Sequence, residues 1–145
     1  MMKQLIFSVS FLMLNMLTSA QVYTVTFTKC QNFTHPATVS TEEAIELDLI
    51  EYPNYTVGEN VFIFNYNTRK LTIERPEENW VYDISQINEN GGPILSCFIE
   101  FENLLTWFRM GQLSENETQF IMVRKEGDQI VGFFSMNSDF SYTVE

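Results

Sequence analysis

Short runs of alternating residues constrain the fold of this chain more than any other feature. Val22–Thr28 alternates β-branched with aromatic residues, and this pattern is typical of strands with one buried face. Strands of this kind are also predicted at 61–66, 71–74, 80–84, 94–101, 119–124, 129–135 and 140–144. Within 94–101, the period of two places Cys97, Ile99 and Phe101 on one face.

Turn-forming residues separate the predicted strands. The clearest hairpin joins 119–124 to 129–135 through Lys125–Asp128, and a second joins 61–66 to 71–74 through Asn67–Lys70. Asn88–Pro93 is rich in Asn, Gly and Pro and predicts a longer turn. Seven to nine short strands with this spacing predict an all-β, mainly antiparallel domain, either a β-sandwich or a small closed β-barrel, with at most one or two short helices.

Two segments fit both helix and strand. Ser40–Glu43 matches a capping box, which predicts a helix over 41–50. The alternation of Ile45, Leu47 and Leu49 with acidic residues favours a half-buried strand instead, and the strand is our interpretation. The segment 103–110 ends at Gly111, a residue common after helices, and remains open between helix and strand.

The first twenty residues match a secretory leader. Lys3 precedes an apolar stretch from Leu5 to Leu17, and small residues follow up to Ala20. We therefore predict a cleaved signal peptide at residues 1–20 and one secreted domain at 21–145, with no membrane span in the mature chain.

Cysteines and glycosylation signals agree with an extracellular location. The chain contains two cysteines, Cys30 and Cys97, and an isolated pair in an oxidising compartment predicts a disulfide. The sequons at Asn32, Asn54 and Asn116 predict surface positions that carry N-glycans.

Charge limits the partners that this chain can bind. The formal net charge is −11, and loss of Lys3 with the leader makes it −12. Such a surface repels phosphate backbones, so we expect no nucleic-acid binding, and a protein partner should be neutral or cationic.

The residue types needed for catalysis are scarce. His35 is the single histidine, and its place beside Pro36 predicts an exposed loop position. The sequence contains no metal-binding, nucleotide-binding or nucleophile motif, and the acidic pair Glu100 and Glu102, which would share a strand face, suits a solvated face. We therefore expect neither an enzyme nor a cofactor or metal.

Aromatic side chains are the remaining candidates for a binding role. Trp80, Trp107 and Phe133 are the most promising, because adjacent aromatics such as Phe133 and Phe134 must point to opposite faces of a strand. The sequence therefore favours a secreted, acidic, glycosylated binding module for an extracellular protein. The alternative is a carrier that holds a small apolar ligand within the β-structure.

Overall fold

The computed structural model describes residues 21–88 and 93–145. The predicted signal peptide at residues 1–20 and positions 89–92 of the expected long turn lie outside the described residues. No helix in the described part of the chain is long and apolar enough to cross a membrane.

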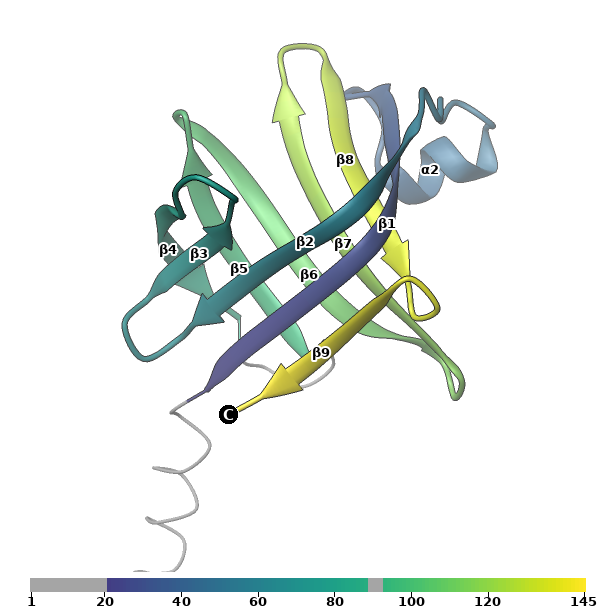
Figure 1. Cartoon of the computed structure of the whole chain (residues 1–145). Coiled ribbons are helices and arrows are strands. Elements are labelled where there is room, and N and C mark those ends of the chain that lie inside the picture. Colours follow the sequence, from purple (N-terminus) through teal and green to yellow (C-terminus); the bar gives the residue numbers. More distant parts are fainter. Residues whose placement is uncertain (1–20, 89–92) are drawn as a thin grey trace, which may run out of the picture.

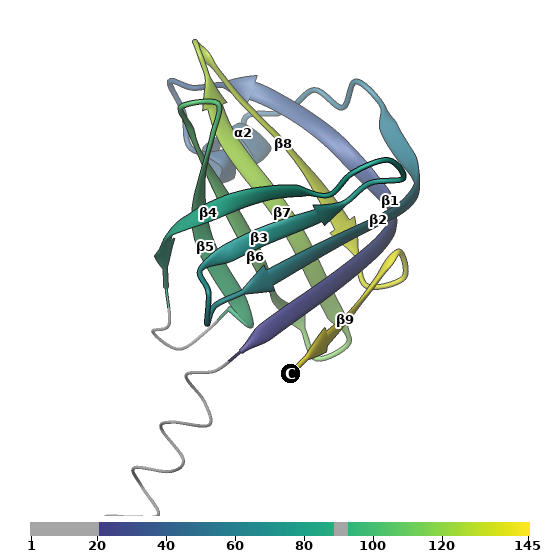
Figure 2. The same cartoon turned by 60° about the vertical axis from the view of Figure 1, so that its left-hand side comes forward.

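The described chain forms a closed barrel of eight antiparallel strands (Figures 1 and 2). The strands β2 to β8 pair consecutively, and β1 pairs with both β2 and β8 to close the ring. Their bounds are β1 Val22–Pro36, β2 Tyr55–Asn65, β3 Lys70–Glu74, β4 Trp80–Ile87, β5 Leu95–Phe101, β6 Leu104–Ser114, β7 Glu117–Glu126, β8 Gln129–Met136 and β9 Phe140–Val144. Every run predicted as a strand lies largely within one of these elements. Of the two predicted architectures, the chain adopts the closed barrel and not the sandwich.

A bulge in β1 allows the ring to close. The pairing with β2 shifts register between Phe27 and Lys29. Before the bulge β1 pairs with β9, and after it β1 pairs with β8. The buried Ser135 hydroxyl donates to the Lys29 carbonyl at 2.6 Å and so satisfies a backbone group that the bulge frees. The bulge thus changes both the partner of β1 and the faces of the residues beyond it.

Phenylalanine rings pack the barrel interior. Phe120 of β7 is fully buried, and its ring centroid lies within 5.7–6.3 Å of six others. These six rings belong to Phe27, Phe62, Phe64, Phe108, Phe133 and Phe140. Most of these pairs are tilted or edge-on, as aromatic rings prefer.

The segment 103–110, which the sequence left open, belongs to strand β6. Glu102 and Asn103 have φ values of 52° and 65° and form a two-residue turn after β5. Positive φ at both central positions is the geometry of a type I′ hairpin, and asparagine tolerates it well. Gly111 therefore lies within a strand and does not follow a helix.

The strand interpretation of 41–50 is wrong. Helix α2 spans Thr41–Glu46, and Ser40 and Glu43 form both arms of the capping box. The alternating Ile45 and Leu47 do not form a buried face, because both are more than 60% exposed. Local capping decided the conformation here. The helix lies outside the barrel wall, beside β1 and β8 (Figures 1 and 2).

Candidate functional site

The two ends of the barrel differ in their connections. At one end, here called the mouth, lie the turn at 102–103, the turn at 127–128, the segment 75–79 and the long connection that carries α2. The opposite end, here called the base, contains the first residues of β1 and the C-terminus (Figure 1).

A cavity of about 170 Å³ occupies the mouth half of the interior, and we call it the inner cavity. Its floor includes Phe62, Phe108 and Phe133, which pack against the buried Phe120 ring. Aliphatic side chains from β3 and β5, including Leu71, Ile73 and Ile99, line its walls. The interior of an eight-stranded barrel can be filled by side chains or can hold one small ligand. Here packed phenylalanine rings fill one part of the interior, and the inner cavity occupies another.

The rim of the inner cavity is aromatic and cationic. The Arg75 guanidinium lies 4.5 Å from the centre of the Trp80 ring, and the Arg124 guanidinium lies 5.5 Å from the centre of the Phe101 ring. Arg124 also forms an ion pair with Glu126. Its Nε atom is buried and has no hydrogen-bond partner among the described residues. The site therefore combines an apolar floor with a polar rim that has an unused donor.

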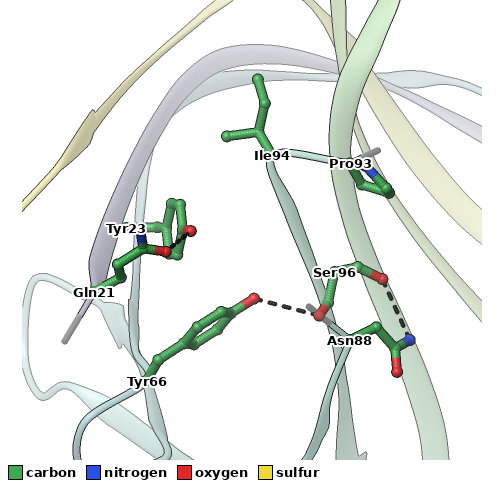
Figure 3. A pocket seen from close by; sticks show the side chains of 7 residues that line it. All are labelled: Gln21, Tyr23, Tyr66, Asn88, Pro93, Ile94 and Ser96. Atoms are coloured by element: carbon green, nitrogen blue, oxygen red, sulfur yellow. Dashed lines mark hydrogen bonds between the residues drawn. The ribbon is translucent and has the colours of Figure 1, made fainter. Parts of the chain in front are cut away.

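A pocket lined mainly by polar side chains lies at the base (Figure 3). The rings of Tyr23 and Tyr66 lie 5.1 Å apart, and the Tyr66 hydroxyl donates to the Ser96 carbonyl at 3.3 Å. Asn88 donates to the Ser96 hydroxyl at 3.5 Å. Burial and the nearby Cys97 raise the pKa of Tyr66, so this phenol remains a neutral donor. The pocket beside them holds about 270 Å³ and is lined mainly by groups bonded to one another, so ligand entry is better served by the mouth.

A second apolar surface lies outside the barrel. A groove of about 570 Å³, here called the outer groove, runs between α2 and the outer face of β6, β7 and β8. Trp107, Val123 and Phe134 line its sheet side, and Ile45 and Tyr52 line the side of α2 and the segment after it. Burying such a surface against a partner would be favourable.

The structure separates the three aromatic candidates. Trp80 and Phe133 meet at the inner cavity, whereas Trp107 faces the outer groove and donates to the Ser96 hydroxyl at 3.1 Å. Of the adjacent pair in β8, Phe133 points inward and Phe134 outward, as the period of two requires. The sequence reasoning missed Arg75 and Arg124. One sequence signal could have found Arg124: residues alternate between the two faces of β7, so Arg124 lies on the same face as Phe120.

The disulfide expected between Cys30 and Cys97 is not formed in the structure, where both are free, buried thiols. Cys30 lies on β1 and Cys97 on β5, and β5 is the fourth strand from β1 in either direction around the ring. A disulfide needs Cα atoms about 4.4–6.8 Å apart, and opposite walls separated by packed phenylalanines do not provide that approach. Burial raises the pKa of both thiols, that of Cys97 to about 12.

His35 is not an exposed loop residue. It lies within β1 at 2% exposure, where the bulge has turned it to the outer face beneath α2. Its Nδ1 lies 2.9 Å from the Pro36 carbonyl oxygen, which only accepts, and its Nε2 lies 3.0 Å from the Thr41 hydroxyl. The ring therefore donates from Nδ1 to Pro36, and its Nε2 pairs with the Thr41 hydroxyl, which can both donate and accept. His35 therefore holds the start of α2 against the barrel.

The three sequons occupy different environments. Asn116 lies in the exposed turn between β6 and β7, and Asn54 is exposed before β2. Asn32 is half-buried, and its side-chain nitrogen donates to the Asn54 side chain at 2.9 Å. Glycan attachment at Asn32 would therefore have to accommodate the neighbouring sequon.

Among the described residues, no group of three or more His, Cys, Asp or Glu side chains is arranged to hold a metal ion. The fold and the site together define a closed antiparallel β-barrel with an apolar inner cavity. Comparison of the chain with protein-family models, curated proteins and solved structures found no match.

Proposed function

We propose that this chain is a secreted, non-catalytic carrier that holds one small apolar ligand in the inner cavity. The observation that carries the proposal is the cavity itself, which runs from a phenylalanine floor to an aromatic rim at the mouth. Sites for small molecules are typically concave, mostly apolar and equipped with a few polar groups. The inner cavity has this composition.

The volume of the cavity limits the ligand. Pockets for drug-sized ligands have volumes of roughly 300–1,000 Å³. A cavity of roughly 150 Å³ lined by Leu, Ile and Phe is known to bind benzene. At about 170 Å³, the inner cavity fits a single ring or a chain of about six carbon atoms.

Secretion rests on the leader-like segment and the three sequons. The N-terminal sequence of the exported protein tests it. We expect a start at or next to Gln21, and an exported product that begins at Met1 would contradict cleavage.

Two adjacent substitutions in β7 test the carrier function. Met122 lines the inner cavity, and Val123 lines the outer groove. Met122→Trp should fill the cavity, whereas Val123→Trp places the same large side chain on the other face of the strand. The measurement is native mass spectrometry of the secreted protein, together with calorimetric titration of 1-hexanol.

We expect an adduct or hexanol binding for the wild-type protein and for Val123→Trp, and its loss in Met122→Trp. Circular dichroism checks that each variant is folded, and Met122→Phe replaces the tryptophan variant if it is not. If the folded wild-type protein neither contains a ligand nor binds hexanol, the carrier function is refuted.

A second function is favoured by the outer groove. It is larger than the inner cavity and includes exposed apolar side chains such as Tyr52 and Leu113. An extracellular protein that is neutral or cationic could dock there. Capture from extracellular fluid should then be lost in Val123→Trp and retained in Met122→Trp, the reverse of the pattern expected for the ligand.

A further inference from the structure

Two of the few cations in this acidic chain line the same cavity. The whole chain has 8 Lys and Arg residues against 19 Asp and Glu residues. Arg75 follows the end of β3, and Arg124 lies on the inner face of β7, in line with Phe120 and Met122. Arginine on the inward face of a barrel strand needs an acceptor, because desolvation of a charged group is costly.

The hydrogen bonds of Arg124 are incomplete. A guanidinium has five N–H donors in a rigid fork that matches a carboxylate. Glu126 pairs with Nη2 at the rim. The buried Nε has no partner among the described residues, and the Arg124 side chain is 23% exposed. Because Arg124 lines the inner cavity and Glu126 pairs with only one nitrogen of the fork, an oxygen of a ligand in the cavity can accept from the remaining accessible N–H groups.

Other groups at the rim support an anion next to Arg124. Burial and, to a smaller extent, the Glu102 charge raise the pKa of Tyr82 above its usual value, although the Arg75 charge lowers it. Tyr82 is therefore a neutral hydroxyl donor at the cavity edge. Glu102 and Glu126 are carboxylates next to these groups, and Glu77 and Glu78 line a surface pocket together with Arg75 and Trp80. The remaining acidic surface acts at longer range and is screened within about 8 Å at physiological salt.

We propose that the inner cavity selects an amphipathic anion, a short apolar tail that carries one carboxylate. The tail lies on the phenylalanine floor, and the carboxylate receives hydrogen bonds from Arg124, with Arg75 as the second cation at the rim. This inference rests on the proposed carrier function and specifies its ligand class.

The test compares two probes of equal length, hexanoate and 1-hexanol, by calorimetric titration of the full secreted chain at pH 7. Hydrogen bonds to charged groups should give hexanoate a preference of about tenfold or more. Arg124→Gln should bring the ratio of the two affinities close to one. Lys125→Gln is the matched control, because it removes a neighbouring positive charge that is exposed on the other face of β7.

Glu126→Gln provides a second variant that does not depend on the folding of Arg124→Gln. It frees Arg124 from its ion pair and should increase the preference for hexanoate. If hexanol binds but the wild-type protein shows no preference for hexanoate, the anion inference is overturned and the carrier function stands. An equal loss of preference in Lys125→Gln would also overturn it. If neither probe binds, both proposals fall.

Discussion

Replacing Phe120 by alanine tests whether the barrel interior is packed as described. The side chain is fully buried, and its six ring neighbours come from five strands other than its own. Truncation of a buried phenylalanine typically costs about 3–5 kcal/mol. We expect about 4–5 kcal/mol here, because strands hydrogen-bonded into a closed ring cannot move inward to fill the space.

Urea unfolding and a thermal scan measure this loss. Small domains are stable by about 5–15 kcal/mol, so the variant should fold with a small margin. Its melting temperature should fall by about 15–20 °C, since 1 kcal/mol shifts a domain of this size by about 4 °C. Phe134→Ala is the matched control, because this ring lies on the outer face against Phe33 and Tyr52. It should cost about 1–2 kcal/mol.

The variant should also enlarge the inner cavity, because three of the rings that contact Phe120 form the cavity floor. At about 24 cal/mol per Å³, 2–2.5 kcal/mol of the penalty corresponds to roughly 100 Å³ of new space. Phe120→Ala should therefore shift the preference among alcohols from hexanol towards octanol. If its stability loss equals that of Phe134→Ala, Phe120 is not inside the barrel and β7 has a different register.

Four further perturbations test other parts of the molecule. Gly132→Ala should cost about 1–3 kcal/mol in urea unfolding, because a Cβ atom there would lie 2.2 Å from a backbone oxygen of β7. Cys30 and Cys97 should resist iodoacetamide until the chain unfolds; a native mass lower by two hydrogens would instead mean a disulfide. Burial raises the pKa of Cys97 from 9.0 to about 12. The contribution of this thiol to the free energy of unfolding should therefore be fully present below pH 9 and fall by about 1.4 kcal/mol per pH unit from pH 9 towards pH 12. Cys97→Ala should flatten this slope. Asn116→Gln should remove one glycan from protein secreted by a eukaryotic host. Asn32→Gln should remove a glycan from a smaller fraction of the molecules, because the Asn32 side chain is bonded to Asn54.

Local pattern predicted most of the strands because burial in this fold depends on single residues that alternate along each strand. The hairpin of β7 and β8 is an example, since its turn residues and alternation agree. Where two local signals conflicted, at 41–50, the capping box determined the conformation, and the chain pairs with β1 again only at Glu51, which forms a single bridge to Thr34. The turn at Glu102 and Asn103 gave the weakest signal, because it contains neither glycine nor proline.

The candidate site could be predicted only in part, because it depends on how distant strands meet. Trp80 and Phe133 were chosen for their chemistry, but nothing local to them shows that they share a cavity while Trp107 does not. The disulfide expected between Cys30 and Cys97 is absent from the structure for the same reason. An oxidising compartment and an isolated pair of cysteines favoured the bond, whereas the order of strands around the ring puts the two thiols on opposite walls.

Strand β7 explains why one barrel offers two different binding surfaces. Its inward residues Phe120, Met122 and Arg124 support the floor, wall and rim of the inner cavity in turn, so polarity rises from the centre to the mouth. Of its outward residues, Ile121 and Val123 are apolar and line the outer groove, with the polar Gln119 beside them. Alternation in an ordinary barrel strand would place polar residues on that outer face. Because a shift of one residue would exchange the two faces, the register of β7 determines which ligand each surface can bind, and substitutions at adjacent positions can separate the two functions.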